Sequence, residues 1–173
     1  MGRYDTDSFG WSGLMSDDRY SWQEGCRYIA RHVSGTHFIP SKETGRGYDK
    51  TNEVTAAIIR NGYKSVFLFG HSNGNIATGM VQSNLEPYGI DVWRLCLDHT
   101  MADSAPLGPN VSHAMDLWAG PPMHRLEVGP GFTGKLIKHD FKPLGHISMT
   151  HDEEVLRLAV EFGQQWRMEN PER

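Results

Sequence analysis

The feature that most constrains the fold is an apolar run, KSVFLF at 64–69, which ends directly in Gly-His-Ser-Asn-Gly at 70–74. A run so nearly continuous predicts a strand that is buried on both faces, as in a parallel sheet covered by helices. A helical pattern at 73–86 begins where the pentapeptide ends. The pentapeptide is therefore predicted to form a sharp turn from a buried strand into a helix.

Ser72 lies at the centre of this turn. Such a turn lifts the central side chain out of the sheet, and glycines at positions 70 and 74 avoid a clash of Cβ atoms with neighbouring backbone. The backbone N–H of Asn73, at the start of the helix, is a candidate oxyanion donor. The pattern predicts a serine nucleophile, with a glycine-rich turn and a chance serine as the alternative. A phosphate-binding turn is disfavoured, because no Gly-Lys-Ser/Thr ending is present.

Strand and helix patterns alternate over the first hundred residues. Other strands are predicted at 36–39, 91–97 and 134–140, and other helices at 20–33, 49–60 and 152–166. This alternation favours an open, mostly parallel α/β sheet with helices on both faces. A length of 173 residues suits a single domain, 1–173.

A serine hydroxyl needs a base to take its proton, and His146 is the best candidate. It lies in a glycine-containing loop between the last predicted strand and the last helix, at the carboxyl edge of the sheet. His151 is the competitor, but it stands beside Asp152 and is expected to begin or cap the last helix. The acid that orients the base is Asp98 or Asp140, because each ends a predicted strand.

Asp98 is favoured over Asp140, because its strand follows the nucleophile helix and should lie next to the nucleophile strand. Asp140 would need a tight turn to meet His146, which follows it closely in the chain. Two further carboxylates, Asp116 and Asp103, are expected to be solvated or to form turns.

The run at 69–74, followed by Arg-Leu-Cys-Leu-Asp at 94–98, resembles the pancreatic-type lipase branch of the α/β-hydrolase superfamily. The likeness extends over about residues 66–166, where later segments are similar to small lipase-like hydrolases of bacteria and phages. The resemblance implies a minimal α/β hydrolase in which Asp98 is the triad acid. His99 stands where that branch has proline.

The N-terminal strands of a full-size hydrolase are expected to be reduced or missing here. In that fold, a loop that follows one of these strands donates the second oxyanion N–H. Only the segment 7–13 is available for this role, as a loop with Trp11 as the candidate donor; a disordered N-terminus is the alternative.

These observations lead to the expectation of a serine hydrolase that cleaves ester or thioester bonds through Ser72, His146 and Asp98. The substrate would be a small-molecule or lipid-like ester. Two alternatives stay open: a non-catalytic, hydrolase-like binding domain, and an acyltransferase with the same nucleophile. No cofactor or metal is expected, because the histidines and cysteines lack the spacing of metal ligands.

Charge and composition disfavour other partners. The formal net charge is −4 and no basic cluster stands out, so nucleic acid is not expected as a partner. The sequence has no apolar run of about 20 residues for a membrane span and no signal-peptide pattern, which predicts a cytoplasmic protein. Cys26 and Cys96 are expected to be reduced, buried thiols. No pattern indicates an oligomeric state.

Overall fold

The structure is a computed structural model that describes residues 4–13, 23–40, 50–100, 102 and 104–171. In this part of the chain, six parallel strands form one sheet in the order β2-β1-β3-β4-β5-β6. The strands are β1 (Ser8–Trp11), β2 (Thr36–Ile39), β3 (Ser65–Ser72), β4 (Asp91–His99), β5 (Val111–Trp118) and β6 (Lys135–Asp140). The predicted open parallel sheet is confirmed.

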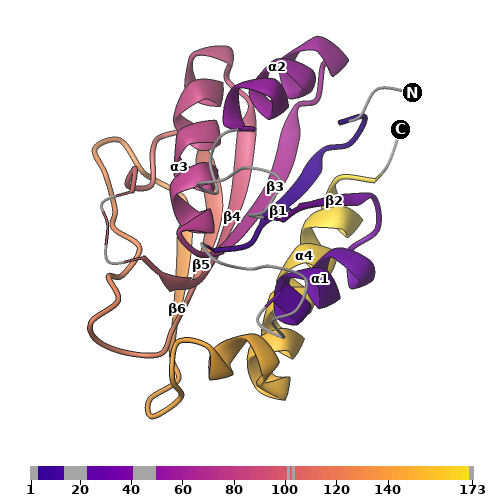
Figure 1. Cartoon of the computed structure of the whole chain (residues 1–173). Coiled ribbons are helices and arrows are strands. Elements are labelled where there is room, and N and C mark those ends of the chain that lie inside the picture. The colour runs from indigo at the N-terminus through magenta and orange to yellow at the C-terminus, as the bar shows by residue number, and fades with distance from the viewer. Residues whose placement is uncertain (1–3, 14–22, 41–49, 101, 103, 172–173) are drawn as a thin grey trace.

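Helices cover both faces of the sheet (Figure 1). The described α-helices are α1 (Gln23–His32), α2 (Thr51–Asn61), α3 (Gly74–Leu85) and α4 (Glu153–Glu169), and short 3-10 helices occur at η2 (Glu86–Tyr88) and η3 (Ser148–His151). Helices α2 and α3 pack on one face, whereas α1 and α4 pack on the other. None of the described helices is long and apolar enough to cross a membrane.

Strand β3 explains why the apolar run in the sequence is continuous. Val66 and Leu68 point into the core under α2 and α3, while Phe67 and Phe69 point into the core under α1 and α4. A strand with helices on both sides must be apolar at every position, rather than at alternate ones. Burial of β3 on both faces is therefore confirmed.

The strand order reverses beside β3. The chain runs from β1 outward to β2, returns to β3 on the other side of β1, and then continues outward through β4, β5 and β6. Ligand sites of open α/β sheets form where the order reverses in this way, outside the carboxyl ends of the strands. Here that point lies between the ends of β1 and β3.

Sequence patterns identify neither β1 nor β5. The segment 7–13 is interpreted from sequence as a loop, but residues 8–11 form a fully buried strand between β2 and β3. Strand β5 contains the polar residues Ser112, His113 and Asp116. Both strands lack the apolar run that marks β3, and pairing with neighbours distant in sequence holds them in place.

Candidate active site

The turn that ends β3 has the strained geometry expected of an exposed nucleophile. Ser72 has φ +53°, and Asp98 at φ +38° is the only other described residue besides glycine with a positive φ. A Cβ built on Gly70 would lie 2.6 Å from the carbonyl carbon and oxygen of Gly74, and one built on Gly74 would lie 2.4 Å from the carbonyl oxygen of Trp11. The close approach of three backbone segments therefore requires both glycines, as predicted.

Buried hydrogen bonds hold this turn against β4. The side-chain amide of Asn75 donates to the carbonyl oxygens of Ser72 (3.1 Å) and Leu97 (3.3 Å). The fully buried guanidinium of Arg94 donates in turn to the Asn75 carbonyl (3.1 Å). Burial lowers the pKa of Arg94 to about 10, so that it stays charged at neutral pH. Sequence reasoning missed this support, although an arginine within a buried strand is a signal, because it requires several partners.

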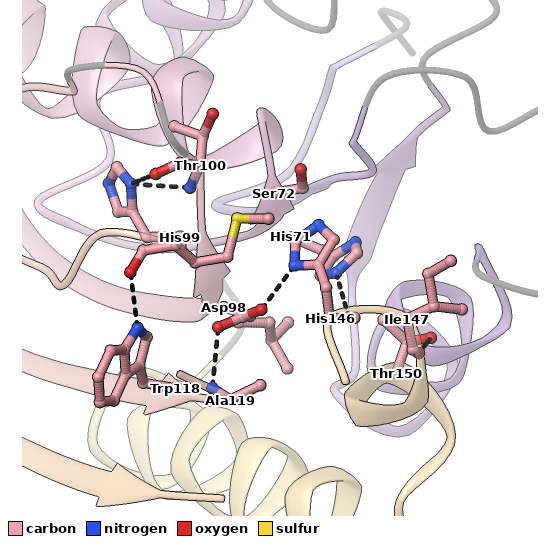
Figure 2. Close-up of polar contacts among 12 residues, drawn as sticks. His71, Ser72, Asp98, His99, Thr100, Trp118, Ala119, His146, Ile147 and Thr150 are labelled. Atoms are coloured by element: carbon pink, nitrogen blue, oxygen red, sulfur yellow. Dashed lines mark hydrogen bonds and ion pairs between the residues drawn. The ribbon is translucent and has the colours of Figure 1, made fainter. Parts of the chain in front are cut away.

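Asp98, the residue before the last one of β4, holds the imidazole of His146 (Figure 2). The His146 Nδ1–H donates to Asp98 Oδ2 at 2.6 Å, and the backbone N–H of Ala119 donates to Asp98 Oδ1 at 2.8 Å. The carboxylate is fully buried, and both of its oxygens accept a hydrogen bond. Because a carboxylate only accepts, Nδ1 carries the proton of the neutral imidazole, which leaves Nε2 able to accept one.

Ser72 lies beside this pair without being bonded to it. The neighbouring residue His71 stacks on His146, and the ring centroids are 4.6 Å apart. Among the described residues, the Ser72 hydroxyl makes no hydrogen bond, and Figure 2 shows it next to the two imidazoles. Such bonds are often long in unliganded enzymes and shorten in the substrate complex. The structure thus brings Ser72, His146 and Asp98 together near the carboxyl ends of β3 and β4. A hydrogen bond joins His146 to Asp98.

The competing candidates for base and acid have other contacts. Asp140 is exposed and forms an ion pair with Arg125, so it does not meet the histidine. His151 is the last residue of η3, and Asp152 caps α4 by accepting from the N–H groups of Glu154 and Val155 at 3.1 Å each. The structure therefore pairs Asp98, rather than Asp140, with the predicted base.

The expectation for Asp116 is wrong. It lies within β5 and is fully buried, whereas the sequence suggested a solvated or turn-forming carboxylate. The error follows from missing β5 itself. The Asp116 Oδ2 accepts from Arg125 at 3.2 Å, and burial raises the pKa of the Asp116 carboxyl despite this partner. Asp103 lies outside the described residues.

The two predicted oxyanion donors come from different elements, the start of α3 and the end of β1, which meet beside Ser72. Asn73 directly precedes α3, and its side-chain Oδ1 accepts from the Thr100 hydroxyl. Trp11 ends β1, and its side chain is buried in the core. The next part of the chain comes nearer: a Cβ built on Gly13 would lie 2.8 Å from the Ser72 Cβ. The segment after β1 therefore abuts Ser72, and donation by the Trp11 N–H stays a prediction.

Comparisons with protein-family models and with curated proteins found no match to this chain. Cys26 and Cys96 are buried, free thiols, as expected. Across the described ranges, no group of three or more His, Cys, Asp or Glu side chains is placed to hold a metal ion. The residues at the ends of β3 and β4, with His146, are therefore the basis for assigning a function.

Proposed function

We propose that this protein is a small serine hydrolase of the α/β-hydrolase type, which cleaves carboxylic or thio esters through Ser72, His146 and Asp98. The observation that carries the proposal is the 2.6 Å hydrogen bond between Asp98 and His146, which lie 48 positions apart in the chain, at the edge where Ser72 ends β3. The order Ser, Asp, His along the chain is also that of α/β-hydrolase triads.

In the proposed reaction, His146 Nε2 takes the proton of the Ser72 hydroxyl as Oγ attacks the acyl carbonyl carbon. The N–H of Asn73 and an N–H from the segment after β1 stabilise the tetrahedral oxyanion. Asp98 stabilises the imidazolium, which then protonates the departing alcohol or thiol. Water, deprotonated by His146, attacks the acyl-serine and releases the carboxylic acid and the free Ser72 hydroxyl.

The backbone strain supports catalysis over a purely binding role. A residue other than glycine in the left-handed region costs on the order of 1–3 kcal/mol, and such residues cluster at functional sites. Here the two described examples are the proposed nucleophile and the proposed acid. Backbone strain therefore coincides with two members of the proposed triad.

A fluorophosphonate probe and a panel of p-nitrophenyl esters of graded chain length test the proposal. The probe is expected to label wild type and not Ser72→Ala, and the variant should lose a factor of about 10⁴ or more in ester hydrolysis while staying folded. Ser83→Ala, which removes an exposed hydroxyl from α3, is the matched control. A folded wild-type protein without labelling or turnover would instead indicate a non-catalytic binding domain.

The identity of the base has its own test. Activity should rise from acidic to neutral pH, because only a neutral imidazole accepts the seryl proton. His146→Ala is expected to remove both the activity and this pH dependence, whereas His151→Ala should retain them. The reverse result would place the base at the end of η3.

A further inference from the structure

Two side chains of the sheet make polar contacts with His146, which lies in the loop between β6 and η3. The loop's own hydrogen bonds are local, such as Leu144 N–H to Phe141 O at 2.7 Å and Met149 N–H to Gly145 O at 3.1 Å. Among the described residues, the polar contacts that join His146 itself to the sheet are those with Asp98 and His71. The position of the base therefore depends on these two side chains.

His71 contacts His146 in two ways. It lies on β3 directly before Ser72, and its side chain is buried. Its Nε2–H donates to the backbone carbonyl of His146 at 3.2 Å, and its ring stacks on the His146 ring with an interplanar angle of 26°. Figure 2 shows the two rings side by side, with one bond to Asp98 and the other to the His146 carbonyl.

We infer that His71 is a positioning residue, which sets the plane and the depth of the His146 imidazole so that Nε2 faces Ser72; this inference rests on the proposed function. The hydrogen bond to Asp98 fixes one ring atom and leaves the ring free to tilt about it. The stack on His71 fixes the ring plane, and the bond to the carbonyl fixes the backbone that carries the ring. Since His71 and Ser72 are adjacent, the same strand, β3, positions both the base and the nucleophile.

The chemistry of a buried, neutral imidazole suits this role. Burial, together with the proximity of His146, lowers the pKa of His71 to about 3, and the nearby His151 acts in the same direction. A neutral ring with its proton on Nε2 donates to a carbonyl and lies against a second ring without charge repulsion. That property matters during turnover, when His146 itself becomes an imidazolium.

Substitutions at His71 separate positioning from simple packing. His71→Leu removes both the stack and the donor, His71→Phe retains a ring, and His71→Gln retains an N–H donor. His113→Leu is the matched control, because the His113 imidazole is also stacked, on Trp93 at 3.9 Å, but lies near the start of β5. Folding is checked by circular dichroism and thermal unfolding.

Hydrolysis of a p-nitrophenyl ester is the first readout. In His71→Leu, kcat is expected to fall about 100-fold with KM within about twofold of wild type, since misplacement of a catalytic group by about 1 Å has such an effect. The Phe and Gln variants should each recover part of the rate, and they provide the test if the Leu variant does not fold. His113→Leu should match wild type. A folded His71 variant with kcat within threefold of wild type would overturn the inference.

A second readout does not require activity. The His146 Nδ1 proton, in its short bond to Asp98, should give a low-field NMR resonance in wild type, in Ser72→Ala and in His113→Leu. In His71→Leu this resonance should broaden or disappear, because the ring is no longer held. An unchanged resonance would overturn the inference even if kcat fell. If wild type hydrolyses no ester, the proposed function fails, while the resonance still reports whether His71 holds His146.

Discussion

At the scale of single residues, the two candidate acids differ in burial and in hydrogen-bond partners. Asp98 is fully buried, and its two oxygens accept from Ala119 and from His146. Asp140 is exposed and is paired with Arg125. Only the first carboxylate is therefore placed to fix the tautomer of the imidazole and to stabilise its charged form.

Replacement of each carboxylate by an amide should give opposite results. Asp98→Asn is expected to lower the acylation rate about 10⁴-fold, because an amide that donates to Nδ1 favours the wrong histidine tautomer. Asp140→Asn should stay within a few-fold of wild type. Single-turnover acylation by an activated ester on folded variants measures both rates. The opposite ranking would move the acid to Asp140 and remove the strongest support for the lipase-like interpretation.

At the scale of elements, the turn from β3 into α3 depends on contact with β1. Gly74 begins α3 directly against the carbonyl of Trp11, so the helix can start only if that position has no side chain. The same contact brings the segment after β1 to the nucleophile. The contact between Gly74 and Trp11 therefore affects both the start of α3 and the position of the segment proposed to donate to the oxyanion.

Gly74→Ala tests this link. The added methyl group would lie 2.4 Å from the Trp11 carbonyl oxygen, and overpacking of this kind should lower the free energy of unfolding by about 3 kcal/mol. The control is Gly62→Ala, where the added Cβ meets no atom within 4 Å and a φ of +71° costs about 1 kcal/mol. Urea denaturation of both variants gives the comparison. Equal losses would mean that β1 and α3 move apart easily.

Sequence patterns predict the elements that are locally distinctive. The apolar run of β3, the glycines around Ser72 and the loop position of His146 are recognisable without neighbours. In the structure, β3 ends at Ser72, and His146 contacts the preceding residue, His71. Strands β1 and β5 are not recognisable, because they are short or polar and are defined by pairing with distant segments. For the same reason, the sequence does not reveal the burial of Asp116 or the stacking of His71 on His146.

At the scale of the whole molecule, folding keeps two buried imidazoles neutral at pH values at which the unfolded chain protonates them. Burial lowers the pKa of His71 to about 3 and that of His99 to about 4, and both side chains are almost fully buried. In the unfolded chain each would titrate near 6.5. Between these values the unfolded state binds protons that the folded state does not, so acidification lowers the free energy of unfolding.

The contribution of His71 can be measured as a difference. Each unit of pH within this window changes the free energy of unfolding by about 1.4 kcal/mol per group. The loss of stability of wild type from pH 7 to pH 5 should therefore exceed that of His71→Gln by about 2 kcal/mol. Urea denaturation at both pH values measures it. An equal loss in both proteins would show that the His71 imidazole is protonated in the folded state.

Under the proposed function, the left-handed backbone at Ser72 sets stability against activity. Glycine adopts a φ of +53° without steric cost, whereas serine and alanine do not. Ser72→Gly is therefore expected to be inactive, yet about 1 kcal/mol more stable than Ser72→Ala, as measured by thermal unfolding. Equal stability of the two variants would argue against strain at this position. A serine at position 72 therefore carries a backbone cost, which the proposed nucleophile role accounts for.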